Sequence, residues 1–180
     1  PIAQRRAADL SGIALSGGQD KIADLKQVLD LIAGQVPLLI EIKDQDGNMG
    51  PAVGPLEAAV AEALSPYRGE VAVMSFNPHS VVAFGNIRAD IPLGLVTDRF
   101  EPDDWPSLSA ERRGYLAQIS DFGTSGVGFI SHNQTQLTDP PVSALKAQGV
   151  PVLCWTVRSP DEERRARRIA DNITFEGYLP

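Results

Sequence analysis

The sequence has 180 residues, of which 43% are hydrophobic and 22% charged, and its formal net charge is −7 at pH 7. This length and composition suit a single globular domain over residues 1–180 and exclude a disordered chain. The negative charge argues against nucleic acid as a partner, because phosphate backbones are bound by basic faces. With one cysteine there is no internal disulfide framework, and no apolar run approaches the ~20 residues of a membrane span.

Six short apolar runs, rich in Val, Ile, Leu or Phe and bounded by turn residues, predict buried parallel strands. In chain order they are Leu38–Lys43, Val71–Phe76, Pro92–Thr97, Val127–His132, Val150–Val157 and Ile173–Tyr178. Cys154 lies inside the fifth run, so we expect it to be a buried, small hydrophobic side chain.

Helices are predicted between these runs from apolar spacing and from capping residues. Leu25, Val28, Leu29 and Ile32 follow the i, i+3, i+4, i+7 pattern, and Gly34 ends that helix. Further helices are expected at Leu56–Leu64, after Asn77–Pro78, in part of Glu101–Gln118, at Pro140–Gln148 and after Ser159–Pro160.

Alternating strands and helices imply a parallel sheet with right-handed crossovers. No glycine-rich nucleotide-binding motif follows any strand, which favours a TIM-type (β/α)8 barrel over a doubly wound sheet. Such a barrel typically needs ~250 residues. We therefore predict an incomplete barrel of about six parallel βα units, with room for about two more units upstream.

Glu41 and Lys43 lie two positions apart on an otherwise apolar strand, so both side chains should project to the same face. In a barrel that face is the interior, at the carboxyl ends of the strands where active sites lie. A buried carboxylate is costly unless it is paired or binds a metal. Two interpretations stay open at this point, a structural ion pair and a catalytic pair.

Other strand ends carry weaker candidates. Ser75, Phe76 and Trp155 close their strands, and each alone is more typical of packing or of a turn than of a site. His79 is expected on the surface of a helix. His132 ends a strand and could face the barrel rim, although a neutral, hydrogen-bonded histidine is the favoured interpretation.

Taken in order, the segments DLKQVLDLI, LLIEIK, VMSFNP, PLGLVTD, GVPVLCWTV and ADNITFEGYLP resemble the glycerophosphodiester phosphodiesterase family. The similarity extends along essentially the whole chain. The family's His-Arg-Gly, Glu-x-Asp and His-Asp segments, which carry its acid/base histidines and two of three metal carboxylates, do not occur in this sequence.

The resemblance implies metal-dependent hydrolysis of a glycerophosphodiester by the full-length protein, with this chain alone inactive. It implies that Glu41 binds a divalent cation, Mg²⁺ or Ca²⁺, and that Lys43 acts in catalysis and contacts the phosphate. Ser75, Phe76 and Trp155 would contribute to substrate binding. We expect Glu41, Lys43, Ser75 and Trp155 to converge on one end of the sheet.

Two other functions stay open: a non-catalytic barrel that binds a phosphate ester or a protein partner, and a lyase or aldolase with Lys43 as a reactive amine. Proximity to Glu41 argues against the second. The expected partner is a small phosphodiester, without nucleic acid or a membrane span. Exposed sheet edges would permit homo-oligomers, and a cytoplasmic location in bacterial lipid metabolism is the default expectation.

Overall fold

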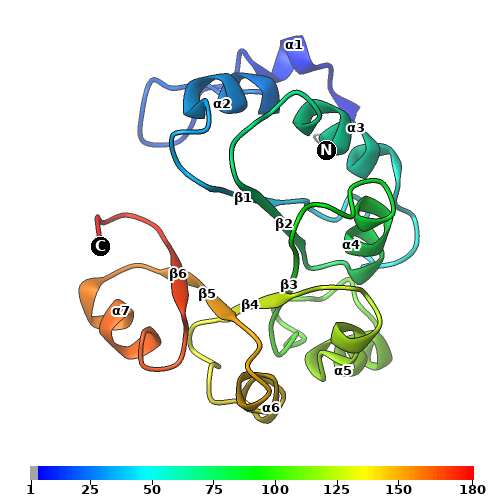
Figure 1. Cartoon of the computed structure of the whole chain (residues 1–180), viewed down its shortest axis with the longest axis vertical. Helices are drawn as coiled ribbons and strands as arrows, with labels where there is room; N and C mark the ends of the chain where they lie inside the picture. Colours follow the sequence, from blue (N-terminus) through cyan, green and yellow to red (C-terminus); the bar gives the residue numbers. More distant parts are fainter. Residues whose placement is uncertain (1–3) are drawn as a thin grey trace.

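The computed structural model describes residues 4–180, which fold as alternating strands and helices (Figure 1). The six strands form one sheet, and the helices lie on its outer side. The helices are α1 Ala7–Leu10, α2 Leu25–Ile32, α3 Pro55–Leu64, α4 Pro78–Gly85, α5 Ala110–Ala117, the 3-10 helix η2 Ser120–Gly123, α6 Pro140–Ala147 and α7 Pro160–Ala166. The strands are β1 Leu38–Glu41, β2 Val71–Ser75, β3 Leu93–Thr97, β4 Phe129–Asn133, β5 Val152–Val157 and β6 Asn172–Phe175.

Every strand pairs in parallel with its neighbour in the sequence, in the order β1-β2-β3-β4-β5-β6. The sheet curls into an arc whose two edges are β1 and β6, and Figure 1 shows the opening between them. This arrangement confirms the prediction of an incomplete TIM-type barrel with six parallel βα units. The edge strands β1 and β6 lie in the first and the last of the six predicted runs, Leu38–Lys43 and Ile173–Tyr178.

The helix boundaries follow from local chemistry. Asp24 and Gln27 form a reciprocal capping box at the start of α2, and the Asn77 side chain accepts a hydrogen bond from the His79 amide at the start of α4. The Ser159 side chain accepts from the Glu162 amide before α7. Gly34, with φ of +75°, takes the left-handed conformation that ends α2, as the sequence predicts. Of the long segment Glu101–Gln118, only α5 is helical.

Alternate side chains of the strands enter two different layers. The outer face packs against the helices in the main core, which includes Val73, Leu95, Ile130 and Cys154. The inner face carries a smaller group built on Met74, Val96 and Phe129, with Ala72, Phe76, Leu153 and Trp155 packed against it. Cys154 is fully buried, as expected, and burial raises the pKa of its thiol to about 11.

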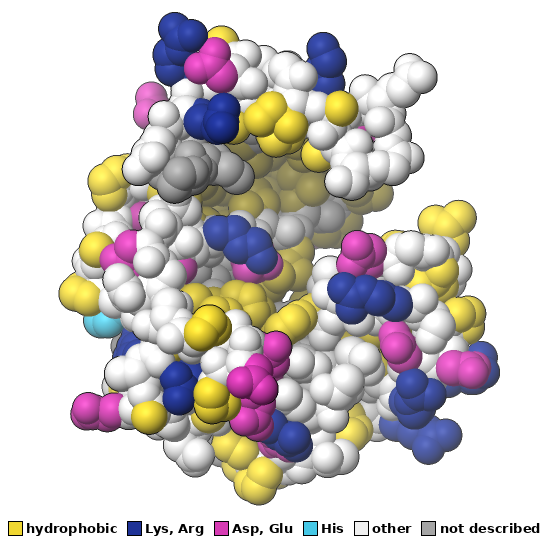
Figure 2. Space-filling model, turned by 180° about the vertical axis from the view of Figure 1, so that it is seen from behind, with side chains coloured by type: hydrophobic (Ala, Val, Ile, Leu, Met, Phe, Trp, Pro, Cys, Tyr) yellow, Lys and Arg dark blue, Asp and Glu magenta, His cyan; other side chains and the backbone are white. Residues whose placement is uncertain are grey.

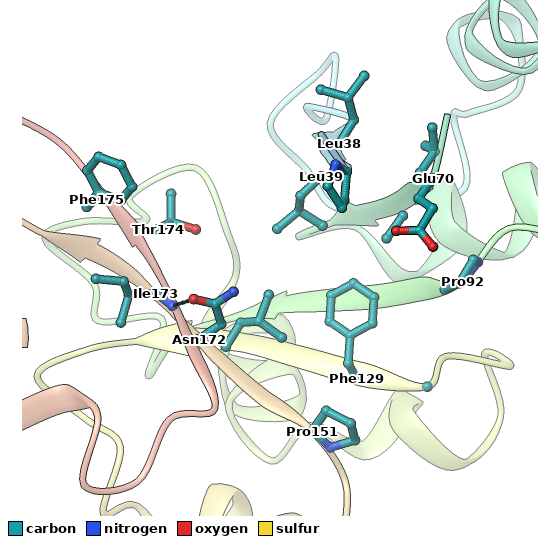
Figure 3. A pocket seen from close by; sticks show the side chains of 15 residues that line it. Leu38, Leu39, Glu70, Pro92, Phe129, Pro151, Asn172, Ile173, Thr174 and Phe175 are labelled. Carbon is teal, nitrogen blue, oxygen red and sulfur yellow. Dashed lines mark hydrogen bonds between the residues drawn. The ribbon is translucent and has the colours of Figure 1, made fainter. Parts of the chain in front are cut away.

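A hollow of about 750 Å³ opens on the inner face, at the amino ends of the strands. Figure 2 shows this side of the molecule as a concave surface with hydrophobic side chains at its back. In Figure 3, Leu39 of β1 lies across the hollow from Asn172 and Thr174 of β6, whereas the side chains of Ile173 and Phe175 point away from it. The hollow is therefore bounded by the two edge strands.

One close approach shapes the inner face. A methyl group on Gly94 would lie 2.2 Å from the ring of Phe129, so only glycine leaves room for that ring. We expect Gly94→Ala to lower the free energy of unfolding by about 1–3 kcal/mol, because it overpacks this layer. Chemical denaturation would measure the loss.

Gly128→Ala is the matched control, because a methyl group there meets nothing within 4 Å. The double variant Gly94→Ala with Phe129→Leu should recover part of the loss, since the smaller side chain relieves the contact. Equal stability of Gly94→Ala and wild type would contradict this account of the inner layer.

Candidate active site

Glu41 and Lys43 form an ion pair at the carboxyl end of β1. The Lys43 Nζ lies 2.7 Å from Glu41 Oε1, and the two side chains are 70% and 22% exposed respectively. A pair this exposed contributes at most about 1 kcal/mol to stability. The fold therefore does not depend on this pair, which leaves the two charges available for binding.

Four aromatic side chains pack together beside this pair, and we call Phe76, Phe100, Trp105 and Trp155 the rim cluster. The ring centroids of Phe76 lie 5.0 Å from Trp105, 5.3 Å from Trp155 and 6.2 Å from Phe100. Lys43 Nζ lies 6.0 Å from the centroid of the Phe76 ring. This is within the range of a cation–π contact, so Phe76 links the ion pair to the cluster.

Trp155 is anchored across the sheet. Its indole Nε1 donates a hydrogen bond to the Ser131 carbonyl of β4 at 3.1 Å, while its ring meets Phe76 edge-on at 79°. Edge-to-face pairs of this kind are worth about 0.5–1.5 kcal/mol beyond buried area. The orientation of Trp155 is therefore set by a backbone acceptor and by an aromatic neighbour together.

The loop after β1 is tied to the loop that precedes α5. Arg112 Nη2 donates to the Met49 carbonyl at 2.6 Å, and Ser107 Oγ donates to the Gly47 carbonyl at 2.9 Å. The Met49 side chain is buried with Phe100, Leu108 and Leu116. The segment that follows Glu41 and Lys43 is thus hydrogen-bonded to the residues that follow Trp105.

Ser75 lies next to Phe76, but the structure places its side chain apart from the rim cluster. It is buried, its Oγ donates to the Ile42 carbonyl at 2.6 Å, and the same oxygen accepts from the Asn77 amide at 3.1 Å. These bonds tie the end of β1 to the end of β2. Its role in substrate binding stays a prediction, while Glu41, Lys43, Phe76 and Trp155 are brought together.

His132 does not face the rim. It lies on the outer face of β4, 2% exposed, and its Nδ1 is 2.7 Å from the Thr97 hydroxyl, as expected for a neutral, hydrogen-bonded histidine. Burial lowers the pKa of His132 from 6.5 to about 4. His79 is exposed on α4, as the sequence predicts.

Metal-binding groups are sparse in the part of the chain that the structure describes. Within residues 4–180, no group of three or more His, Cys, Asp or Glu side chains could hold a metal ion. Glu41, a hard oxygen donor at the rim, suits Mg²⁺ or Ca²⁺ as one ligand, but one carboxylate does not make a site.

Asp98 and Trp105 were not singled out as site residues by sequence reasoning. Asp98 directly follows β3 and is 4% exposed, and its Oδ2 accepts a hydrogen bond from Trp105 Nε1 at 3.3 Å. The position of Asp98 at a strand end was a usable signal. No sequence pattern indicates that Trp105, inside an irregular loop, reaches the same place.

The parallel arc, with its ion pair and aromatic wall at the carboxyl ends of the strands, defines the active-site rim of a (β/α)-barrel protein. Residues 2–171 match the model of the glycerophosphoryl diester phosphodiesterase family. The chain belongs to this family. No curated protein matches it.

Solved structures agree in fold. The chain superposes on a glycerophosphodiester phosphodiesterase from Parabacteroides distasonis with a TM-score of 0.68 and 19% identity, covering 97% of this chain and 68% of the other. The TM-score with an Oleispira antarctica phosphodiesterase in complex with the product sn-glycerol-3-phosphate is 0.70, at 20% identity. That match covers 97% of this chain and 68% of the other. The TM-score with a protein from Silicibacter pomeroyi, named as a glycerophosphoryl diester phosphodiesterase, is 0.66, at 23% identity. That match covers 84% of this chain and 52% of the other.

The chain thus spans about half the length of one of these structures and about two thirds of the other two. Within the described residues, no helix has the length and apolar character needed to cross a membrane.

The buried His132 makes stability depend on pH. In the unfolded chain its pKa is near 6.5, so the unfolded state binds the proton first as the pH falls. Its stabilising contribution, up to about 3 kcal/mol, is complete above pH 6.5 and is lost as the pH falls toward 4.

Denaturation at several pH values, with an NMR titration of the imidazole, would test this expectation. His79→Gln leaves His132 as the sole histidine and so assigns the resonance. A ring that titrates near pH 6.5 in the folded protein would contradict the burial argument.

Proposed function

We propose that the protein to which this chain belongs hydrolyses a glycerophosphodiester to an alcohol and glycerol phosphate. The observation that carries the proposal is the Glu41–Lys43 pair, held beside aromatic side chains at the barrel rim, in a member of this family. A lysine that is 70% exposed, and that is not needed for stability, is available to an incoming phosphate.

Lys43 would contact a phosphoryl oxygen and offset the negative charge that the phosphodiester brings to the site. Glu41 holds the ammonium in place at 2.7 Å. Trp155 and Phe76 would form an apolar wall against the carbon skeleton of the substrate.

A divalent cation, Mg²⁺ or Ca²⁺, would supply the main charge stabilisation when bound. Glu41 would be one of its ligands. The other ligands would come from outside residues 4–180, because the groups within that range do not make a metal site. The general acid and base would also come from outside this chain. The 180 residues alone are therefore expected to be inactive.

The two sheet edges supply a further proposal, that copies of this chain associate through β1 and β6. Parallel edge strands expose unpaired backbone groups, which invite pairing with another chain. Light scattering would decide it, and a monodisperse monomer would count against it.

Lys43→Met and Glu41→Gln should each lower kcat/KM of the full-length protein for a glycerophosphodiester by at least about 100-fold, because each removes a charge used on the phosphate or the metal. Thermal unfolding should change little, since the pair is exposed. Lys26→Met is the matched control, because that lysine is also exposed and paired, with Asp30.

Unchanged turnover in both variants would defeat the proposed roles. A full-length protein that is inactive but still binds glycerol phosphate would instead favour the alternative of a non-catalytic barrel.

Chelation with EDTA should abolish hydrolysis by the full-length protein, and adding Mg²⁺ or Ca²⁺ should restore it. The 180-residue chain should show no tight binding of either ion by calorimetry, because its described residues 4–180 hold no group of three or more metal-binding side chains. Metal-independent turnover by the chain itself would overturn this mechanism.

A further inference from the structure

The carboxylate of Asp98 is buried at the carboxyl end of β3, and within residues 4–180 the donors that approach it are neutral. Its Oδ1 accepts from the Arg99 amide at 2.7 Å and lies 3.5 Å from Asn133 Nδ2, and its Oδ2 accepts from Trp105 Nε1 at 3.3 Å. The Arg99 guanidinium is turned away, toward Asp139. In the described part of the chain Asp98 forms no ion pair of its own, so its burial depends on its hydrogen bonds, of which Trp105 supplies one.

The group that Asp98 holds is Trp105, the one side chain of the rim cluster that comes from an irregular loop. Its ring lies 5.0 Å from Phe76 at 55° and 5.0 Å from Phe100 at 48°. Trp155 contacts Phe76 separately, at 5.3 Å. The Phe76 ring therefore contacts one tryptophan from the sheet, Trp155, and one from the loop, Trp105.

Lys43 depends on the position of the Phe76 ring. Its flexible side chain is 70% exposed, and its ammonium lies 2.7 Å from Glu41 and 6.0 Å from the centroid of the Phe76 ring. If Phe76 shifts, the ammonium keeps its carboxylate but loses the surface that directs it.

We propose that Asp98 and Trp105 are positioning residues for Lys43: the carboxylate fixes the indole, the indole fixes the Phe76 ring, and the ring directs the ammonium toward the phosphate of the substrate. Neither residue touches the substrate in this account. The inference rests on the proposed function, since it gives Lys43 the phosphate to bind.

The test is a double-mutant cycle in the full-length protein, with hydrolysis of glycerophosphocholine as the assay. Trp105→Ala should raise KM about 10-fold, the size expected when a hydrogen bond to a charged group is weakened, with kcat within about threefold of wild type. Lys43→Met should raise KM at least as much. The double variant should match Lys43→Met alone, because Trp105 acts through Lys43.

Trp105→Phe keeps a ring but removes the donor to Asp98, and Asp98→Asn changes the acceptor, so both should give smaller rises in KM and remain usable if Trp105→Ala fails to fold. Asp103→Asn is the control, because Asp103 is an exposed acid of the same loop. It should leave KM unchanged.

Additive effects of Trp105→Ala and Lys43→Met on KM would overturn the positioning role while leaving the proposed function intact. A loss of thermal stability with unchanged KM in the Trp105 and Asp98 variants would overturn it as well. If Lys43→Met itself changes neither KM nor kcat, the proposed function fails, and the positioning role fails with it.

Discussion

The pairing of each strand with its neighbour in the sequence is the constraint on which the site depends. Because all six strands run parallel in chain order, their carboxyl ends meet at one rim. The registers Glu41 with Met74 and Asn133 with Trp155 bring residues from distant parts of the chain to the same level. Period-two alternation then decides which of them face inward. A residue therefore belongs to the site when it lies near the carboxyl end of its strand and its side chain points to the inner face.

Those two rules explain what could be predicted from the sequence. Glu41 and Lys43, spaced by two, had to share a face, and the structure pairs them at 2.7 Å. Phe76 and Trp155, each at a strand end, share the inner face and contact each other. The same parity separates Ser75 from Phe76, since adjacent strand residues point to opposite faces. Val71, Val73 and Ser75 form the outward series, and a contact between Ser75 and the substrate stays a prediction.

The rest depended on tertiary contacts that no local pattern encodes. The Trp105 indole donates to Asp98 from an irregular loop. Arg112 and Ser107, which follow in the chain, are hydrogen-bonded to the segment after β1. His132 has the opposite parity to the inward residues Phe129 and Ser131, which places it under the helices. Sequence spacing leaves the direction of a single histidine at a strand end undecided until the register of its strand is known.

The inward-facing side chains differ in kind between the amino and the carboxyl ends of the strands. At the amino ends, Leu39 and Phe129 line an apolar hollow between the edges, whose walls offer little polar chemistry. At the carboxyl ends, the ion pair joins Glu41, the last residue of the edge strand β1, to Lys43 just beyond it. Its aromatic neighbours come from the residue after β2, from β5 and from the loop after β3. An edge strand has a hydrogen-bonded neighbour on one side only. The Lys43–Phe76 contact and the Ser75–Ile42 hydrogen bond therefore both connect the end of this edge strand to β2.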